Sequence, residues 1–391
     1  MYIVFVTAFF AESEEKPLAG MPGYIYKISK FLKQRGHEVE IVAGAGFSKK
    51  WKYKEVTVYN CGIPQELEGN VFSISRKILQ REIVFQKKLQ EINRNKKIDI
   101  VQYAGWSGVG CLHSLKCPGI LRISTYSRIQ YKESEIFRHV ECYSFWERMA
   151  GRHADGILSP SRVLGEHLGH DIHKKVVIME TPYNINVVED ESLFRNKLAG
   201  KNYILFYGQT SIEKGFVVIE DMMLEFLQKN EDAYFVVAGW NSPQGGSDAV
   251  SILRKKLGRY ADRFIYLGPI NQSMLFPVIR GAKCVLIPSL IDNLPNSCLE
   301  ALCLGQIVIG TYGTSLEQLV IDNVNGFLVA PGNSEELLQA AIQAYHLGEE
   351  KRQCMITSSR STIKQFSPEV AVAKLEKYYN WSIKQYRGKT K

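Results

Sequence analysis

Two acidic residues stand eight positions apart in the segment Pro288–Gly305, with Asp292 before a proline-containing turn and Glu300 after it. The six residues before this segment, AKCVLI, have the length and β-branched content of a buried strand, and the run after the turn predicts a helix. Strand, loop and helix in this order form a crevice at the carboxyl end of a parallel sheet, where ligands of open α/β folds bind. The pattern therefore predicts a ligand site.

The predicted helix begins near Pro295, which Leu294 and Asn296 flank. Unpaired backbone N–H groups and the helix dipole favour an anionic group at such a position, phosphate above all. Glu300, about one turn into the helix, is placed to accept hydrogen bonds from a sugar or ribose hydroxyl. The alternative is that Asp292 is only a turn or cap residue and that Glu300 is a solvated helix residue.

The elements around this segment alternate between strand and helix. Six apolar runs in the second half are separated by helix-length stretches, which predicts a parallel, doubly wound domain. These runs are residues 203–209, 233–240, 264–270, 282–288, 307–313 and 326–331.

The first half follows the same plan. An apolar decamer, MYIVFVTAFF, is read as the first strand, and an amphipathic helix then runs from Tyr24 towards Gly36, which is placed to terminate it. Ser161 is a cap-like residue before the helix RVLGEHL. The remaining strands are predicted at residues 37–44, 98–103, 119–125, 155–161 and 176–184.

A second helix is predicted over residues 72–92. Its core stripe consists of Ile74, Ile78, Phe85, Leu89 and Ile92. Its other side is basic, formed by Arg76, Lys77, Arg81, Lys87, Lys88 and Arg94. This side is either a solvated face or a membrane-surface contact.

Domain boundaries follow from these elements. Residues 1–190 are predicted to form an N-terminal Rossmann-like domain and residues 200–367 a second one, while residues 185–201 contain few apolar residues and suggest a linker. Residues 368–391 predict a C-terminal helix with aromatic anchors. A chain of 391 residues exceeds the size at which one core stops growing, which agrees with two domains.

Composition limits the classes of protein and partner. No apolar run approaches the roughly 18 residues of a membrane span, and the first strand lacks the flanks of a signal peptide, so we expect a cytoplasmic protein. The eight cysteines form no CxxC pair and no metal-ligand cluster, and suggest buried thiols in a reducing compartment. Mixed charges without a recognisable module argue against nucleic acid.

The net charge of +9 is uneven. Residues 1–200 contain 29 Lys and Arg against 22 Asp and Glu, and the remainder contains 20 against 18. An anionic acceptor, peripheral contact with an anionic membrane at the inner face, or solubility alone would each account for the basic first half.

These residues resemble the GT-B glycosyltransferases, specifically the retaining enzymes of glycosyltransferase family 4. The similarity is strongest in YGQTSIEKG, VVAGW, YLGPI, the Pro288–Gly305 segment and NVNGFLVAP, and in the first half it rests on GMPGYIYKISKFLKQRGHEVEIV and ADGILSPS. The resemblance implies two doubly wound Rossmann-like domains that face each other across a cleft. It also implies a C-terminal helix that crosses back onto the first domain.

The resemblance assigns roles by position. Asp292 and Glu300 match the family's paired acids, with Asp in place of the first Glu, so Asp292 contacts the donor sugar and Glu300 the ribose. Lys214 neutralises the donor diphosphate, which makes Asp292 and Lys214 the candidate catalytic residues. The remaining donor-binding candidates are Gly20 at the phosphates, Gln209, Pro269 and Ile270 at the base, and Leu294, Pro295 and Asn296 at the sugar and phosphate.

The implied reaction moves a sugar from a nucleotide-diphosphate sugar to a glycan, lipid-linked or small-molecule acceptor, without a metal or other cofactor, as in polysaccharide and glycoconjugate biosynthesis. A uridine diphosphate (UDP) sugar is the commonest donor in the family. Gln209 stands where the family usually has Arg, Ser124 where many members have His, and Ala19 where a glycine is usual; Arg122 is a candidate replacement base. These departures favour the alternative of a catalytically degenerate scaffold subunit in a glycan-assembly complex.

Overall fold

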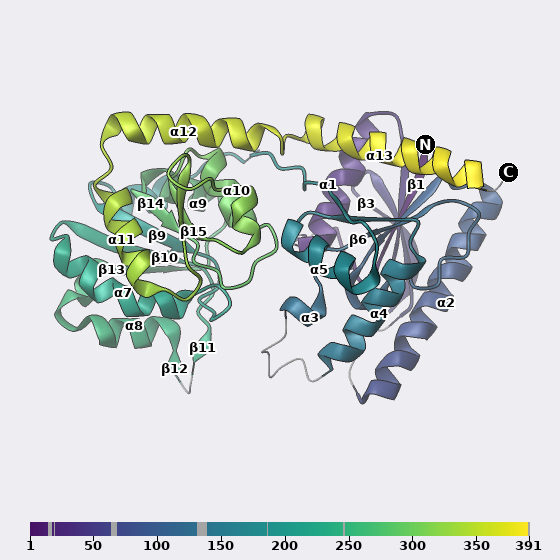
Figure 1. The fold of residues 1–391 in the computed structure, drawn as a ribbon, viewed down its shortest axis with the longest axis horizontal. Coiled ribbons are helices and arrows are strands. Elements are labelled where there is room, and N and C mark those ends of the chain that lie inside the picture. Colours follow the sequence, from purple (N-terminus) through teal and green to yellow (C-terminus); the bar gives the residue numbers. More distant parts are fainter. Residues whose placement is uncertain are drawn as a thin grey trace. The chain divides into compact units, whose positions relative to one another are not determined.

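The computed structural model describes residues 1–14, 18, 20–63, 69–130, 139–185, 187–244 and 247–389. The chain forms two compact units, shown in Figure 1. The first unit comprises Met1–Pro182 with Phe366–Lys391, and the second comprises Tyr183–Gln365. Each unit contains a predominantly parallel sheet with helices on both faces, so the predicted α/β class is confirmed.

The first sheet has the strand order β3-β4-β2-β1-β5-β6-β7-β8. All neighbours are parallel except the edge strand β3, which pairs antiparallel with β4. The strands are β1 (Tyr2–Thr7), β2 (Glu38–Ala43), β3 (Ser48–Tyr53), β4 (Val56–Cys61), β5 (Ile100–Ala104), β6 (Gly119–Arg122), β7 (Gly156–Ser159) and β8 (Val177–Ile178).

Helices cover both faces of this sheet. On one face, α1 (Gly20–Gln34) and α13 (Pro368–Lys389) share a hydrophobic cluster with the strands. On the other face lie α2 (Val71–Asn95), α4 (Val140–His153) and α5 (Arg162–Ile172). The short elements are η1 (Trp106–Gly108) and α3 (Ser127–Gln130). The predicted cap is confirmed, because Ser161 accepts a hydrogen bond from the Leu164 N–H at the start of α5.

Helix α2 confirms the predicted core stripe, all five residues of which are buried. The predicted basic side is wrong at Arg81, which is buried. Its guanidinium donates to the hydroxyl of Ser107 at 2.8 Å and to the carbonyl of Ser107 at 2.7 Å. The cation is therefore a structural partner of the loop after β5 and not part of a solvated face.

The second sheet has the strand order β13-β10-β9-β14-β15-β16, and all its pairs are parallel. All six predicted strands are present, as β9 (Asn202–Tyr207), β10 (Ala233–Ala238), β13 (Phe264–Gly268), β14 (Cys284–Leu286), β15 (Val308–Thr311) and β16 (Gly326–Val329). A short hairpin, β11 (Pro243–Gln244) and β12 (Ser247–Asp248), follows β10.

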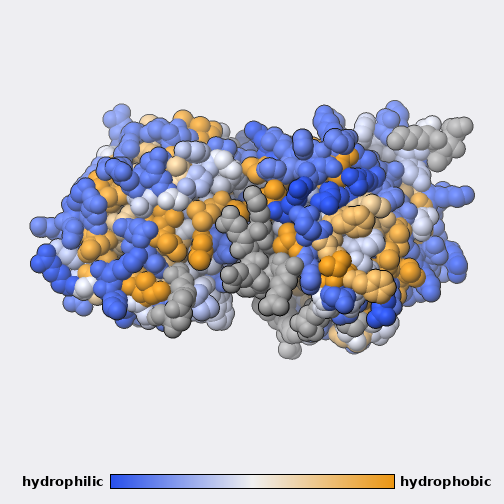
Figure 2. Space-filling model, turned by 60° about the horizontal axis from the view of Figure 1, so that its bottom comes forward, coloured by the Kyte–Doolittle hydropathy of each residue, from blue (hydrophilic) through white to orange (hydrophobic). Residues whose placement is uncertain are grey.

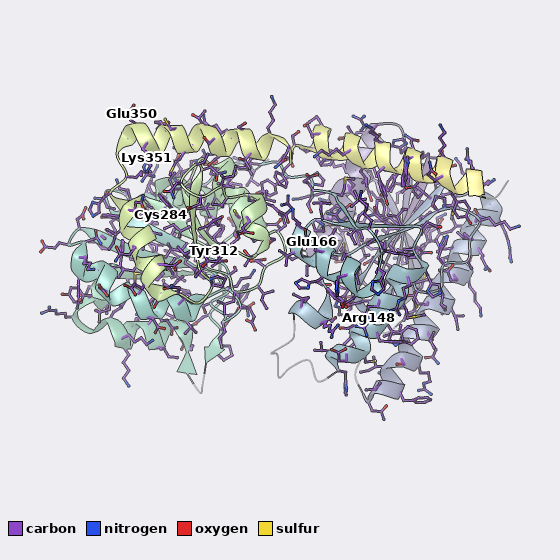
Figure 3. All side chains as sticks on the ribbon, viewed as in Figure 1. Arg148, Glu166, Cys284, Tyr312, Glu350 and Lys351 are labelled. Carbon is purple, nitrogen blue, oxygen red and sulfur yellow. The ribbon has the colours of Figure 1, made fainter. Side chains whose placement is uncertain are left out.

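One hydrophobic core fills the side of this sheet covered by α7 (Phe216–Lys229), α8 (Ala249–Leu257) and α11 (Ser334–Tyr345). Cys284 in β14, labelled in Figure 3, belongs to this core and is completely buried. Of the eight cysteines predicted to be buried, Cys354 is exposed and two are half-buried. The other helical elements of this unit are α6 (Ser192–Lys197), η2 (Gly258–Arg263), α9 (Gln272–Gly281), α10 (Asn296–Cys303), η3 (Ser315–Gln318) and α12 (Glu349–Lys364).

Two predicted segments differ from the structure. The strand predicted over residues 176–184 is only β8, because its partner β7 ends at Ser159, immediately before Pro160. The predicted linker at 185–201 instead packs onto the second unit, where Glu189 pairs with Arg280 at 2.6 Å. The buried side chain of Leu198 anchors the end of α6, which the sparse apolar content of the segment did not reveal.

No helix among the described residues is both long enough and apolar enough to cross a membrane.

Candidate functional site

The predicted donor-binding residues of the second unit lie in loops at the carboxyl ends of three strands of one sheet. Gln209 follows β9, Pro269 and Ile270 follow β13, and the Asp292 loop connects β14 to α10. Because all strands of this sheet are parallel, these loops share one edge, the edge at which open α/β sheets bind ligands.

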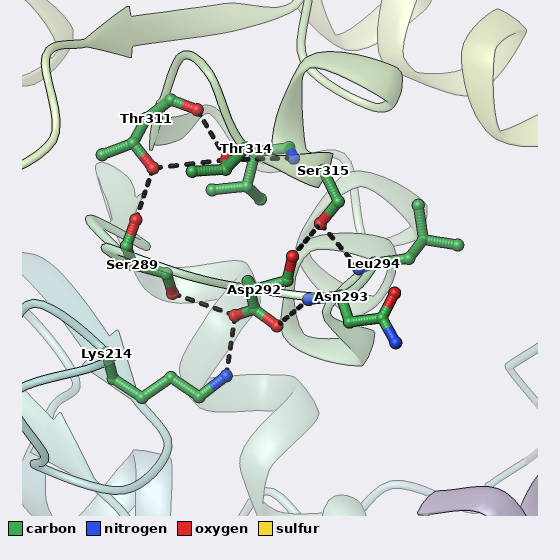
Figure 4. A network of polar contacts seen from close by, with 9 residues as sticks. Lys214, Ser289, Asp292, Asn293, Leu294, Thr311, Thr314 and Ser315 are labelled. Atoms are coloured by element: carbon green, nitrogen blue, oxygen red, sulfur yellow. Dashed lines mark hydrogen bonds and ion pairs between the residues drawn. The ribbon is translucent and has the colours of Figure 1, made fainter. Parts of the chain in front are cut away.

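Lys214 and Asp292 form an ion pair at this edge, with 2.7 Å between Lys214 Nζ and Asp292 Oδ2 (Figure 4). The carboxylate also accepts a hydrogen bond from the Ser289 hydroxyl at 2.9 Å and from the Asn293 N–H at 2.8 Å. The Asp292 side chain is 9% exposed and the Lys214 side chain 39% exposed. The carboxylate is thus fixed in place, while the ammonium group remains accessible to a ligand.

A glycine allows Lys214 to reach this position. Gly215 has φ +73°, and a Cβ atom there would lie 1.9 Å from the carbonyl oxygen of Pro288. Only a residue without a side chain permits this approach, and so the glycine of the EKG sequence brings the Lys214 loop against the Asp292 loop.

Helix α10 begins as predicted, with Pro295 as its N-cap residue and Asn296 as its first residue. Leu294, immediately before the cap, has φ +53°, which a side chain rarely adopts. Its N–H donates to the Ser315 hydroxyl at 2.6 Å. The first helical amide with a backbone acceptor is that of Cys298, which donates to Pro295 at 3.1 Å, so the preceding amides face the loop as an anion site requires.

The backbone of the Asp292 loop is held by hydroxyl groups that the sequence did not identify as site residues. The Ser315 hydroxyl donates to the Asp292 carbonyl at 2.9 Å, and the Thr311 hydroxyl donates to the Ser289 carbonyl at 2.6 Å (Figure 4). Thr314 closes the turn by donating to the Thr311 carbonyl at 2.8 Å. Their only signal in the sequence is TYGTS, which begins at the last residue of β15 and is typical of an ordinary turn.

Glu300 lies inside α10 and is buried. Its carboxylate accepts a hydrogen bond from the Gln272 side chain at 2.9 Å, at the start of α9. Burial raises the pKa of the Tyr183 hydroxyl, and the charge of Glu300 raises it further. Burial likewise raises the pKa of the Tyr207 hydroxyl, again with a contribution from Glu300. Glu300 is thus a buried acceptor next to the loop after β13, and not the solvated helix residue of the alternative interpretation.

Among the described residues, the remaining candidates make no hydrogen bond with this ion pair. Gln209 is exposed at the end of β9, and Gly20 is the exposed first residue of α1 in the first unit, with φ +56°. The prediction that Arg122 supplies the missing positive charge is wrong, because this side chain is completely buried. It donates to the Met179 carbonyl and the Thr181 hydroxyl, each at 3.0 Å. Ser124 is half-buried, and Ala19 lies outside the described residues.

Two units, each built on a predominantly parallel sheet with flanking helices, are the features of the GT-B fold. The chain belongs to glycosyltransferase family 4. Residues 188–362 match the model of the glycosyl transferases group 1, and residues 19–186 match the model of glycosyltransferase family 4.

Solved structures share this fold over almost their whole length. A sucrose-phosphate synthase from Thermosynechococcus elongatus superposes with a TM-score of 0.76 at 15% identity, covering 97% of this chain and 99% of the other. HepE from Anabaena, solved in complex with UDP, gives a TM-score of 0.66 at 14% identity, covering 97% and 100%. At such identities the likeness concerns the fold.

Two uncharacterized glycosyltransferases of Methanocaldococcus jannaschii are similar in sequence. One is 26% identical over 159 residues, which are 40% of each chain. The other is 21% identical over 211 residues, which are 52% of this chain and 48% of the relative. The chain therefore spans less than half of the length of each of these curated relatives.

Proposed function

We propose that this protein is a retaining glycosyltransferase that takes its sugar from a nucleotide-diphosphate donor, with UDP as the favoured nucleotide. The acceptor class is a glycan, a lipid-linked sugar or a small molecule in polysaccharide or glycoconjugate biosynthesis. The observation that carries this proposal is the ion pair of Lys214 and Asp292 beside the N-terminus of α10. A cation and free helix amides together suit a diphosphate, and a fixed carboxylate beside them suits the hydroxyls of its sugar.

Each residue then has a separate task. Lys214 and the amides before Cys298 stabilise the charge that grows on the departing diphosphate, in place of a metal ion. Asp292 orients the donor sugar, and Glu300 accepts hydrogen bonds from the ribose in exchange for the one from Gln272. The protein contributes positioning and electrostatic stabilisation, and no residue forms a covalent bond with the sugar.

Retention follows if the acceptor attacks from the face that the diphosphate leaves. The bond between the anomeric carbon and the diphosphate oxygen breaks, and a bond from the same carbon to the acceptor oxygen forms. The proton of the acceptor hydroxyl passes to the departing diphosphate, so charge and atoms balance without an enzyme base.

The test is transfer from a panel of UDP, guanosine diphosphate (GDP) and adenosine diphosphate (ADP) sugars, with the anomeric configuration of the product read by NMR. Lys214→Ala should lower kcat by roughly 10²- to 10³-fold, the usual effect of removing one group that stabilises the developing negative charge. Lys255→Ala, which removes an exposed lysine of α8, is the matched control. An inverted product would exclude the retaining mechanism, and full activity of Lys214→Ala would exclude the assigned role.

We also propose a cytoplasmic enzyme with peripheral contact to an anionic membrane through α2. Phe72 is 79% exposed at the start of this helix, and hydrophobic residues reach the surface of the first unit in Figure 2. Exposed Arg76 and Lys87 lie on the same helix as exposed Ile83 and Val84, which is the mixture expected for an interfacial helix.

Co-sedimentation with vesicles containing anionic lipid at low and high salt tests this contact. We expect binding that salt weakens and that Phe72→Glu reduces several-fold, whereas the same change at Trp381, exposed on α13, should leave it unchanged. Absence of binding at low salt would exclude the contact.

A further inference from the structure

Trp240 lies at the same edge of the second sheet and has no role in the site described so far. It follows β10 directly and is 71% exposed, compared with 54% for Trp381 on α13. An exposed indole is a large apolar surface that water solvates poorly. At the edge where the ligand-binding loops meet, such a surface is available to an aromatic ligand group.

Hydrogen bonds fix the backbone on both sides of this indole. The Gly239 N–H donates to the Gly268 carbonyl at 2.9 Å, immediately before the Pro269 loop. The Thr210 N–H donates to the Trp240 carbonyl at 3.0 Å, immediately after Gln209. Trp240 is therefore held between the loop predicted to meet the base and the loop that leads to Lys214.

The close contact of these strand ends requires glycine. Gly239 has φ +139°, and a Cβ atom there would lie 1.8 Å from the Gly208 carbonyl oxygen. The glycine before Trp240 thus lets the ends of β9 and β10 meet, and Trp240 is the first side chain after this contact.

The order of the strands sets the direction of a bound donor. The N-terminus of α10 and the Asp292 loop follow β14, and the sheet continues through β9 and β10 to β13. Neighbouring strands are about 4.8 Å apart, so these three steps span about 14 Å. A donor whose phosphates lie at Lys214 and α10 has its ribose and base in series along this edge, which brings the base to β10 and β13.

We infer that Trp240 is an aromatic platform on which the nucleobase of the donor stacks. This inference rests on the proposed function, since it assumes a nucleoside diphosphate at Lys214. Stacking uses the face of the base and leaves its edge to hydrogen bonds with the loop at Pro269 and Ile270. The platform accepts any base, and selection among bases then falls to the loop.

The experiment measures binding by the full-length protein of UDP, GDP and ADP, and then of pyrophosphate, which lacks a base. For the tightest of the three nucleotides, Trp240→Ala should weaken binding roughly 5- to 150-fold, the range for loss of one base–aromatic stack. Trp240→Phe should stay within about threefold, because it retains an aromatic face. Pyrophosphate should bind both variants and the wild type equally.

Fluorescence provides an independent signal. The nucleotide, but not pyrophosphate, should quench the wild type, and Trp240→Phe should lose that change while Trp381→Phe keeps it. Equal nucleotide affinity of Trp240→Ala and the wild type would overturn the platform and leave the proposed function intact. A wild type that binds neither the nucleotides nor pyrophosphate would overturn the proposed function itself, and the inference with it.

Discussion

The carboxylate of Asp292 is held before any ligand binds, because the Ser289 hydroxyl and the Asn293 N–H both donate to it. Lys214 completes this arrangement as a counter-ion that is free to turn towards a phosphate, since its side chain is the more exposed of the pair. Such preorganised groups need no rearrangement when charge develops on the leaving group, which is the main source of electrostatic catalysis.

Gln209 supplies the first prediction at the residue scale. It is exposed at the start of the loop that leads to Lys214, and it carries no charge to offer a diphosphate. Gln209→Arg should therefore tighten UDP binding by about 10-fold or more, the effect of one added charge-assisted hydrogen bond. Isothermal titration at two salt concentrations measures the change.

The control for this prediction is Gln209→Ala, which should stay within about threefold of the wild type. Transfer activity separates the two functional classes considered from the sequence. If Gln209→Arg creates activity in a silent wild type, the protein is a scaffold whose donor site has degenerated. An active wild type excludes that class.

Residue types and spacing identified candidate site residues only where the chemistry is unusual. The spacing of Asp292 and Glu300 around a proline-containing turn marked them as candidates, whereas Lys214 was assigned only through the family resemblance. Thr311 and Ser315 could not be identified in this way, since a hydroxyl in a turn is common and their contacts join segments more than twenty residues apart. Sequence spacing contains no information about which turn a hydroxyl reaches across the sheet edge.

At the element scale, the start of α10 depends on one hydroxyl. Ser315 accepts from the Leu294 N–H and donates to the Asp292 carbonyl, so it holds the strained residue and the backbone of Asp292. Ser315→Ala leaves a buried N–H unpaired and should cost about 1 to 3 kcal/mol of unfolding free energy. It should also weaken UDP binding, since the loop is no longer fixed.

Chemical denaturation and nucleotide titration check both parts of this prediction. Ser358→Ala is the control, because that exposed hydroxyl only donates to the Cys354 carbonyl within α12. It should change the unfolding free energy by less than about 0.5 kcal/mol. Unchanged stability and affinity in Ser315→Ala would contradict the role assigned to this hydroxyl.

Helix α2 supplies another prediction. Glu82 is completely buried, and its carboxylate accepts from the Gly110 N–H at 2.8 Å and pairs with Arg81 at 3.3 Å. Arg81→Ala removes the counter-ion from a buried carboxylate and should cost about 3 to 5 kcal/mol. Arg76→Ala, on the exposed side of the same helix, should cost less than about 0.5 kcal/mol. Unfolding free energies from denaturant titration of the two variants measure this difference.

A double variant separates charge from packing. Arg81→Met with Glu82→Met leaves no unpaired charge and should recover much of the loss. If it is no more stable than Arg81→Ala, the loss comes from the hydrogen bonds of this pair to Ser107 and Gly110 and not from the unpaired charge. The sequence pattern predicted α2 and its core stripe but not this pair, since periodicity places the core face and cannot show that the loop after β5 covers a flank of the helix.

At the scale of the whole molecule, the hydrophobic cores are separate. The cluster of the second unit runs from Ile204 to Met355, and the clusters of the first unit use the strands from β1 to β7 together with α13. Proteins built from such units depart from two-state unfolding. Calorimetry should therefore resolve two transitions that respond to different variables.

The unfolding transition of the first unit should respond to pH through Glu147. This residue is buried in α4 and accepts from the N–H and the hydroxyl of Ser127 at 2.9 and 2.8 Å. Burial raises the pKa of its carboxyl group to about 7. Between pH 4.5 and 7 the folded state therefore holds a proton that the unfolded state has lost, so stability falls as pH rises through this window, by about 3 kcal/mol for this group.

Glu147→Gln removes this proton linkage and keeps an acceptor for Ser127. When the pH is raised from 5 to 8, the transition temperature of the first unit should fall by roughly 6 to 12 °C more in the wild type than in the variant. UDP at about 100-fold over its dissociation constant should stabilise the second unit by about 2.7 kcal/mol, and so raise the temperature of that unit's transition alone. The two perturbations are thus expected to act on different units. If the pH-dependent difference between the wild type and Glu147→Gln appears only in the UDP-sensitive transition, the buried carboxyl and the nucleotide-sensitive region unfold together.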